Sequence, residues 1–159
     1  MVRRSLYNAT VPAWAGFTFT ETMVVIATLG PLAGLAIPTY WNYIEEAKIT
    51  RAIAEIAMLQ KEIYAYNEKN ERLPTNLADI GSASLPDPWG NPYEYLNFDT
   101  VKGYGKMRKD HHLVPINSDF DLYSMGRDGL SETPIQNPKS QDDIVRANNG
   151  TYIGLASEY

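Results

Sequence analysis

Three acidic residues in the C-terminal third of the chain have the chemistry of a cation site. Asp142 and Asp143 are adjacent, and Asp128 precedes them across a polar loop that holds little to form a core. Adjacent carboxylates repel each other, and a hard cation such as calcium, which takes about six to eight oxygen ligands, reverses the sign of that energy. The spacing does not match an EF-hand. From the residues alone, the set is either a calcium site or a solvated acidic loop.

The other reactive side chains form no catalytic pattern. His111 and His112 are adjacent, so their rings point in different directions in an extended chain, and the sequence has no cysteine to complete a metal site with them. The sequence shows no Ser/His/Asp arrangement, nucleotide-binding loop or pair of catalytic carboxylates. We interpret the histidines as surface residues and expect no catalytic residues and no enzymatic activity.

Glu21 stands at the edge of an apolar run. No charged residue occurs from Thr22 to Ala36. A carboxylate beside such a segment is costly unless it finds a partner, so an ionisable residue there is a functional hypothesis. The alternative is an ordinary membrane anchor or an uncleaved signal peptide, in which this glutamate has no role.

Glu21 also ends the motif Gly-Phe-Thr-Phe-Thr-Glu of residues 16–21. This motif resembles the prepilin peptidase site of type IV pilins and type II secretion pseudopilins. That family is cut after the glycine and methylated on the new N-terminus, so the resemblance implies a leader over residues 1–16 and processing at Gly16 and Phe17. An ordinary signal peptide has its apolar core before the cleavage site, whereas here the apolar run follows it. Two arginines near the start of the leader favour a cytoplasmic N-terminus.

The apolar run has the length of a membrane span. Residues 17–38 suffice to cross the roughly 30 Å of hydrocarbon in a bilayer. Residues 39–72 are polar but carry apolar residues at intervals of three and four, which predicts an amphipathic continuation of the same helix. Its apolar face consists of Ile49, Ile53, Ile56, Leu59, Ile63 and Tyr66. We expect one long helix, with bending or melting near residues 30–38 at prolines such as Pro38.

Residues 73–159 are expected to form a globular head. Three stretches alternate well enough for strands, namely residues 93–98, 119–124 and 152–155. In the second stretch, Phe120 and Leu122 fall on one face and the neighbouring residues on the other. We expect residues 99–118 to form a polar, exposed connection.

The charge balance excludes one class of partner. The chain carries 14 basic and 19 acidic residues, a formal net charge of −5. Such a surface repels nucleic acid, and no basic stripe offsets it. We expect no nucleic-acid partner.

Two motifs in the head narrow the family resemblance. Residues 87–93 read Asp-Pro-Trp-Gly-Asn-Pro-Tyr, and residues 121–129 read Asp-Leu-Tyr-Ser-Met-Gly-Arg-Asp-Gly. Both are similar to motifs of the major pseudopilins of type II secretion. The resemblance covers most of the chain apart from residues 99–118 and the tail after Gly150. It implies an α+β, type IV pilin-like fold, in which a long N-terminal helix packs on a small antiparallel β-sheet head with a calcium-binding loop.

The resemblance also assigns the acidic residues. Major pseudopilins bind calcium in this loop, and Asp128, Asp142 and Asp143 match the side-chain ligands. Met125 and Ser140 match positions that contribute backbone oxygens. Ca²⁺ is therefore the expected cofactor.

The implied function is that of a structural subunit of the type II secretion pseudopilus, a periplasmic helical fibre that drives protein export across the outer membrane. The helix would pass once through the inner membrane, with the N-terminus cytoplasmic and the head periplasmic. Phe17, Glu21 and Pro38 would serve assembly, since the Glu21 carboxylate would pair with the amino group of Phe17 on an adjacent subunit. The implied partners are further copies of the chain, minor pseudopilins, the inner-membrane assembly platform, prepilin peptidase and the membrane.

Two alternatives remain open. A major type IV pilin of a surface pilus shares the N-terminal motif, although many such pilins close their C-terminal region with a disulfide and this chain has no cysteine. A membrane-anchored binding protein or enzyme would use the loops of the head and would tolerate changes at Glu21.

Overall fold

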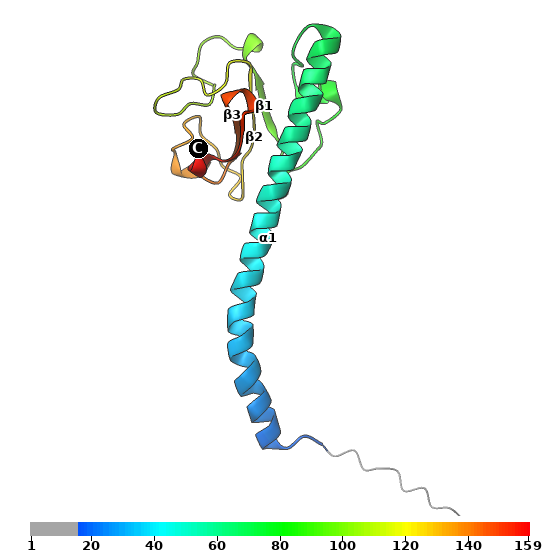
Figure 1. Ribbon diagram of the computed structural model, residues 1–159, viewed down its shortest axis with the longest axis vertical. Helices are drawn as coiled ribbons and strands as arrows, with labels where there is room; N and C mark the ends of the chain where they lie inside the picture. The colour runs from blue at the N-terminus through cyan, green and yellow to red at the C-terminus, as the bar shows by residue number, and fades with distance from the viewer. Residues whose placement is uncertain (1–15) are drawn as a thin grey trace, which may run out of the picture. The chain divides into compact units, whose positions relative to one another are not determined.

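The computed structural model describes residues 16–159. Its main elements are one long helix, α1 (Phe19–Asn70), and one four-stranded antiparallel sheet with its strands in chain order (Figure 1). The strands are β1 (Glu94–Asn97), β2 (Phe120–Ser124), β3 (Ile144–Ala147) and β4 (Tyr152–Leu155). Single 3₁₀ turns occupy Leu77–Ile80, Phe98–Thr100, Pro138–Ser140, Asn148–Gly150 and Ala156–Glu158. The described chain divides between Trp41 and Asn42 into two compact units.

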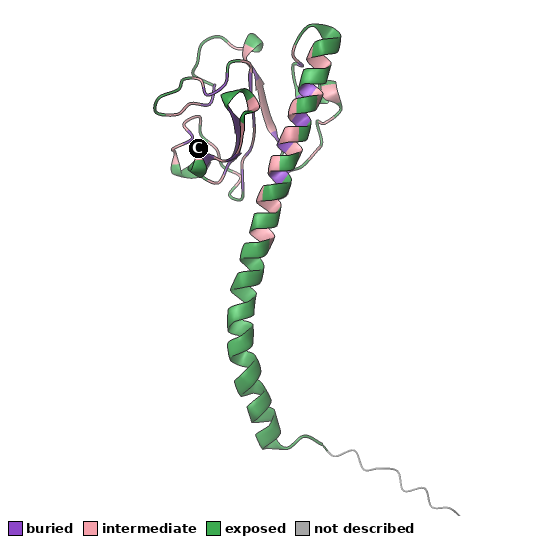
Figure 2. Cartoon of the chain, in the orientation of Figure 1, coloured by how far each residue is buried: buried purple, intermediate pink, exposed green. Residues whose placement is uncertain are grey.

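In the described chain, the first unit consists of the apolar half of α1 and the three residues before it. Every residue from Gly16 to Trp41 is exposed, as the uniform green of this part of Figure 2 shows. Among the described residues, α1 is the one helix long and apolar enough to cross a membrane. Pro31 and Pro38 lie inside α1, which continues through both, so the expected melting near residues 30–38 does not occur. The predicted leader lies outside the described residues except for Gly16.

The second unit begins with the amphipathic half of α1, which packs on the sheet. Ala52, Ile56, Leu59 and Ile63 are fully buried and form the helix side of the main core (Figure 2). From the sheet and its flanks, the same core receives Leu77, Tyr93, Phe120, Leu122 and Ile144. The spacing of three and four along α1 brings its apolar residues onto the one face that meets the sheet, as predicted.

Arg146 on β3 fixes this packing from within the core. Its side chain is fully buried, and all five guanidinium hydrogens find acceptors. On α1, it donates to Gln60 Oε1 at 2.6 Å and to the Tyr64 hydroxyl at 2.8 Å. It also forms a two-pronged pair with both carboxylate oxygens of Asp119 and donates to the Phe120 carbonyl, over whose ring it lies at 3.9 Å. A buried charge is tolerated only when it is paired and hydrogen-bonded in this way.

The sheet contains one strand more than the sequence predicted. The stretches expected as strands correspond to β1, β2 and β4, whereas β3 is additional and pairs with both β2 and β4. All four residues of β3 are buried. A strand covered on both faces shows no alternation of apolar and polar residues, so the pattern that identified the other strands was absent.

The second face of the sheet is covered as well, which corrects two expectations. Residues 99–118 are not simply an exposed connection, because Met107, Arg108, Ile116 and Asn117 are buried. The loop after Asp128, which was expected to hold little to form a core, contributes Ile135, which is 2% exposed. Together with β3 and the last 3₁₀ turn, these segments build a second core, which consists of Ile116, Ile135, Val145, Ala147 and Ala156. Successive side chains of a strand point to opposite faces of the sheet, so β2 and β3 also place apolar side chains on this second face. The two segments bury these side chains.

Candidate functional site

The turn of residues 87–93 closes on the end of β2 through Asp87. The Asp87 carboxylate is buried, and its Oδ1 accepts the backbone N–H groups of Trp89 and Asn91 at 3.0 and 2.8 Å. Its Oδ2 accepts the hydroxyl of Ser124, the last residue of β2, at 2.5 Å. Asn91 in turn donates to the Gly126 carbonyl at 3.0 Å. The two head motifs, distant in sequence, therefore form one hydrogen-bonded unit.

The same turn is attached to α1. The Trp89 indole donates to Glu45 Oε1 at 3.0 Å, and the Tyr93 hydroxyl donates to Glu55 Oε2 at 2.6 Å. Burial raises the pKa of Tyr93, and the neighbouring Glu55 raises it further, so its hydroxyl stays a donor. Trp89 is partly buried and packs against the main core.

The acidic loop begins directly after this unit. Gly126 has a φ of +65°, and a Cβ there would lie 2.2 Å from the Asp142 carbonyl oxygen and 2.9 Å from Asp142 Oδ2. Only glycine fits this position without strain. The close approach lets the Asp128 N–H donate to Asp142 Oδ2 at 3.0 Å, while Asp128 Oδ1 accepts the Leu130 N–H at 2.7 Å. Two of the three predicted ligands, Asp128 and Asp142, are therefore brought together.

The third predicted ligand, Asp143, turns into the protein. Its side chain is fully buried, and its Oδ2 is ion-paired with the Arg108 guanidinium and accepts the Ser131 hydroxyl at 2.6 Å. Its Oδ1 is buried without a hydrogen-bond partner. Burial raises the pKa of Asp143 to about 6, because desolvation outweighs the attraction of Arg108. The carboxylate is thus only partly compensated by the groups around it.

These residues meet part of the requirement for calcium. In the described part of the chain, no three acidic or histidine side chains converge closely enough to hold a metal ion as they stand. The donor chemistry nevertheless suits a hard cation, since three carboxylates flank the loop and one buried carboxylate oxygen has no partner. Because Oδ2 of Asp143 is committed to Arg108, Asp143 can offer a cation one oxygen only.

The two predicted carbonyl ligands lie at the ends of the loop. Met125 is half-buried and follows β2 directly. Ser140 is fully buried; its hydroxyl donates to the Glu132 carbonyl at 2.9 Å, and its own carbonyl accepts the Asp143 N–H at 3.3 Å. The Ser140 carbonyl is therefore directed at the backbone of a predicted side-chain ligand.

At the other end of the chain, Glu21 and Thr18 form a capping box on α1. Glu21 Oε2 accepts the N–H and the hydroxyl of Thr18 at 2.8 and 2.7 Å, and the Glu21 N–H donates back to Thr18 Oγ1 at 3.2 Å. Gly16 and Phe17 precede this cap and are exposed, and Pro38 lies inside the helix. Each described hydrogen bond of the carboxylate goes to Oε2, so the capping box leaves Oε1 for another group.

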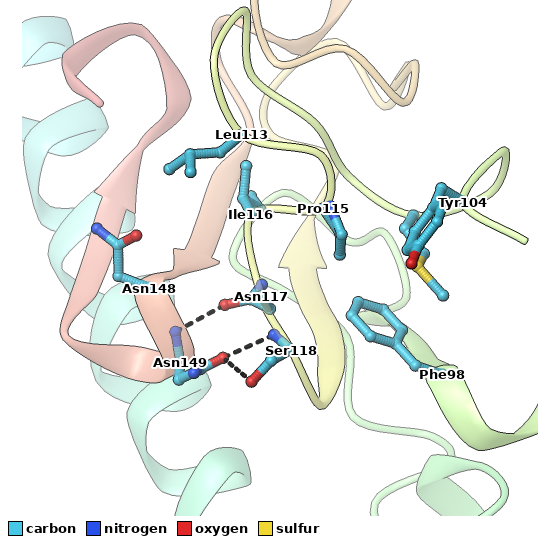
Figure 3. A pocket seen from close by; sticks show the side chains of 10 residues that line it. Phe98, Tyr104, Leu113, Pro115, Ile116, Asn117, Ser118, Asn148 and Asn149 are labelled. Atoms are coloured by element: carbon cyan, nitrogen blue, oxygen red, sulfur yellow. Dashed lines mark hydrogen bonds between the residues drawn. The ribbon is translucent and has the colours of Figure 1, made fainter.

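A hollow in the head lies at the second face of the sheet. It has a volume of about 610 Å³ and is bordered mainly by the segment before β2 and the turn between β3 and β4 (Figure 3). Two of its lining residues are joined, because Ser118 donates its N–H and its hydroxyl to Asn149 Oδ1 (Figure 3). Tyr104 is its one ionisable lining residue. His111 and His112 are both exposed, as predicted, and neither lines the hollow.

Sequence reasoning missed two residues that organise the site. Asp87 had a usable signal, because aspartate at the start of a Pro- and Gly-containing turn accepts backbone N–H groups two residues on. Arg108 had none, because it sits in a polar stretch whose burial depends on the second face of the sheet.

Comparisons with known proteins agree with the family that the sequence resembles. No protein-family model matches the chain. Type II secretion system core protein G of Aeromonas hydrophila is 32% identical over 140 residues, covering 75% of this chain and 87% of the relative. The protein of the same name from Dickeya chrysanthemi is 32% identical over 139 residues, with 85% of this chain and 87% of the relative covered. That from Pseudomonas aeruginosa is 32% identical over 136 residues, with 72% and 84% covered. No solved structure matches.

Replacing Asp87 tests the hydrogen-bonded unit. Asp87→Ala leaves two backbone N–H groups and one hydroxyl without their acceptor, so we expect a loss of about 3 kcal/mol in the free energy of unfolding. Asp87→Asn keeps one acceptor oxygen and should lose about 1 kcal/mol. The measurement is denaturant unfolding of the full chain in detergent, with Asp99→Ala at an exposed position as the control. Equal stability of the Asp87→Ala and Asp99→Ala variants would contradict the assignment.

Proposed function

The chain belongs to the family of type II secretion system core protein G, the major pseudopilins, and we propose that it polymerises into a periplasmic fibre that drives protein export across the outer membrane. The observation that carries this proposal is the first half of α1, which is apolar and exposed along its whole length. The surface-pilus alternative is not favoured, because the relatives are named as secretion components. The role is structural rather than catalytic.

The path of the subunit follows from the order of its segments. An N-terminal apolar helix fits a membrane-anchored protein. The N-terminus lies in the cytoplasm and the head in the periplasm, because the arginines precede the helix and the head follows it. Prepilin peptidase cuts after Gly16, and Phe17 becomes the methylated N-terminus. Minor pseudopilins and the inner-membrane assembly platform then add the subunit to the fibre.

Glu21 sets the register of neighbouring subunits. Its Oε2 serves the capping box with Thr18, and its Oε1 receives the amino group of Phe17 from the adjacent subunit. A buried pair of this kind gives specificity, because any axial slip leaves both charges unpaired in an apolar environment. Residues 22–38, including Pro38, supply the apolar packing around it.

Changing Glu21 separates assembly from membrane insertion. Glu21→Ala should leave the membrane-bound amount of the protein unchanged and lower the yield of fibres in the periplasmic fraction by about tenfold or more, since it leaves the Phe17 ammonium without a partner. Fibre yield and membrane fraction are measured in cells that carry the secretion system. Glu68→Ala, an exposed glutamate near the end of α1, serves as the control. Normal fibre yield from the Glu21 variant would refute the register role.

The acidic loop holds calcium in this proposal. Asp128 and Asp142 contribute carboxylates, Asp143 contributes its free Oδ1, and Met125 and Ser140 contribute backbone oxygens. Support comes from the partnerless buried oxygen and from the raised pKa of Asp143. Bound calcium would supply positive charge that offsets the carboxylates of the loop, and it would add to the attachment of the loop at the end of β2.

Calcium removal tests this part directly. Ligand that binds only the folded state at about a hundredfold excess over its Kd adds about 2.7 kcal/mol. Chelator should therefore lower the Tm of the full chain in detergent by about 5 °C or more. Asp142→Asn should abolish most of that shift, whereas Asp99→Asn should retain it. An unchanged wild-type Tm in chelator would rule out the site.

A further inference from the structure

Arg108 is a buried cation in the segment that was expected to be an exposed connection. Its side chain is 3% exposed. The guanidinium is ion-paired with Asp143, donates to the Ser131 hydroxyl, and donates to the Glu132 carbonyl at 3.0 Å. It also lies 4.2 Å from the centre of the Tyr123 ring on β2.

These contacts join three separate parts of the head. Tyr123 belongs to the sheet, Ser131 and Glu132 belong to the acidic loop, and Asp143 ends that loop immediately before β3. The backbone of the Arg108 segment is fixed as well, because its N–H donates to Asp121 Oδ2 at 2.6 Å. One side chain therefore fastens both ends of the loop to the sheet.

The fastened loop is the same loop that carries the proposed calcium ligands. Arg108 engages Asp143 through Oδ2 and leaves Oδ1 buried and unpartnered. The guanidinium would thus neutralise the Asp143 carboxylate at Oδ2, while a metal ion would neutralise it at Oδ1. Two positive charges so near each other repel, so each weakens the attraction of the other for the loop.

We infer that Arg108 is a built-in cation that fastens the loop of residues 128–143 without metal, and that it and calcium substitute for each other in neutralising Asp143. The second part rests on the proposed calcium site, whereas the first does not. In this chain, calcium then binds a loop that Arg108 already holds in place. The affinity of the loop for calcium is lower than the three carboxylates would give without Arg108.

Arg108→Gln, in the full chain in detergent, tests the inference through loop opening and metal affinity. Trypsin cleavage after Lys139, an exposed residue of the loop, reports opening and is followed by mass spectrometry. Wild type should resist in chelator, whereas the Gln variant should be cut about tenfold faster in chelator and be protected again by calcium. The calcium Kd of the variant, from titration calorimetry, should fall about tenfold.

Two further variants complete the experiment. Arg72→Gln removes an exposed arginine and should behave as wild type. Arg108→Lys keeps the positive charge but lacks the planar guanidinium. In chelator, its loop should be cut by trypsin at a rate between those of wild type and the Gln variant.

The outcomes separate the two claims. Cleavage of wild type in chelator as fast as the Gln variant would overturn the fastening role. A Gln variant that calcium does not protect, or that fails to fold even in calcium, would overturn the substitution of one cation for the other. If neither protein binds calcium while the Gln variant still opens, the proposed calcium site fails and the fastening role of Arg108 stands.

Discussion

The rest of this structure depends on an apolar helical surface that the subunit does not cover itself. From Phe19 to Trp41, α1 extends about 35 Å at 1.5 Å per residue, and none of its residues is buried. Water is a poor environment for such a surface, so it requires lipid or further copies of itself. Glu21 is the one charged group in that segment, and the capping box already satisfies one of its oxygens. The proposed second partner for the other oxygen would make the association of this apolar segment with further copies specific.

In the second unit, the amphipathic half of α1, the sheet and the acidic loop must keep fixed positions relative to one another. Two buried arginines do this on opposite faces of the sheet. Arg146 ties β3 to the amphipathic half of α1 through Gln60 and Tyr64. Arg108 ties the acidic loop to β2 and to Asp143. With no cysteine in the chain, charged clamps serve where small extracytoplasmic domains often use disulfides.

Local patterns identified the parts of the fold in which apolar and polar residue types alternate. The helical face with Ile56, Leu59 and Ile63 was readable because charged residues lie opposite it. β2 was readable because Phe120 and Leu122 alternate with polar residue types, although one of these, Asp121, is itself buried. β3 was missed because both of its faces are buried and it contains Arg146. In the site, residue type alone identified the three aspartates. The burial of the Asp143 side chain could not be predicted, because it depends on the ion pair with Arg108, and no local sequence pattern indicates that Arg108 is buried.

The most direct test of the central claim asks what covers the apolar half of α1 in cells. A photoreactive benzoylphenylalanine at Leu32, which is 64% exposed in the subunit, would bond to whatever lies against it on illumination. We predict a ladder of covalent multimers of this chain that requires the inner-membrane assembly platform. Monomer alone, with the platform present and the chain in the membrane, would contradict assembly through this helix.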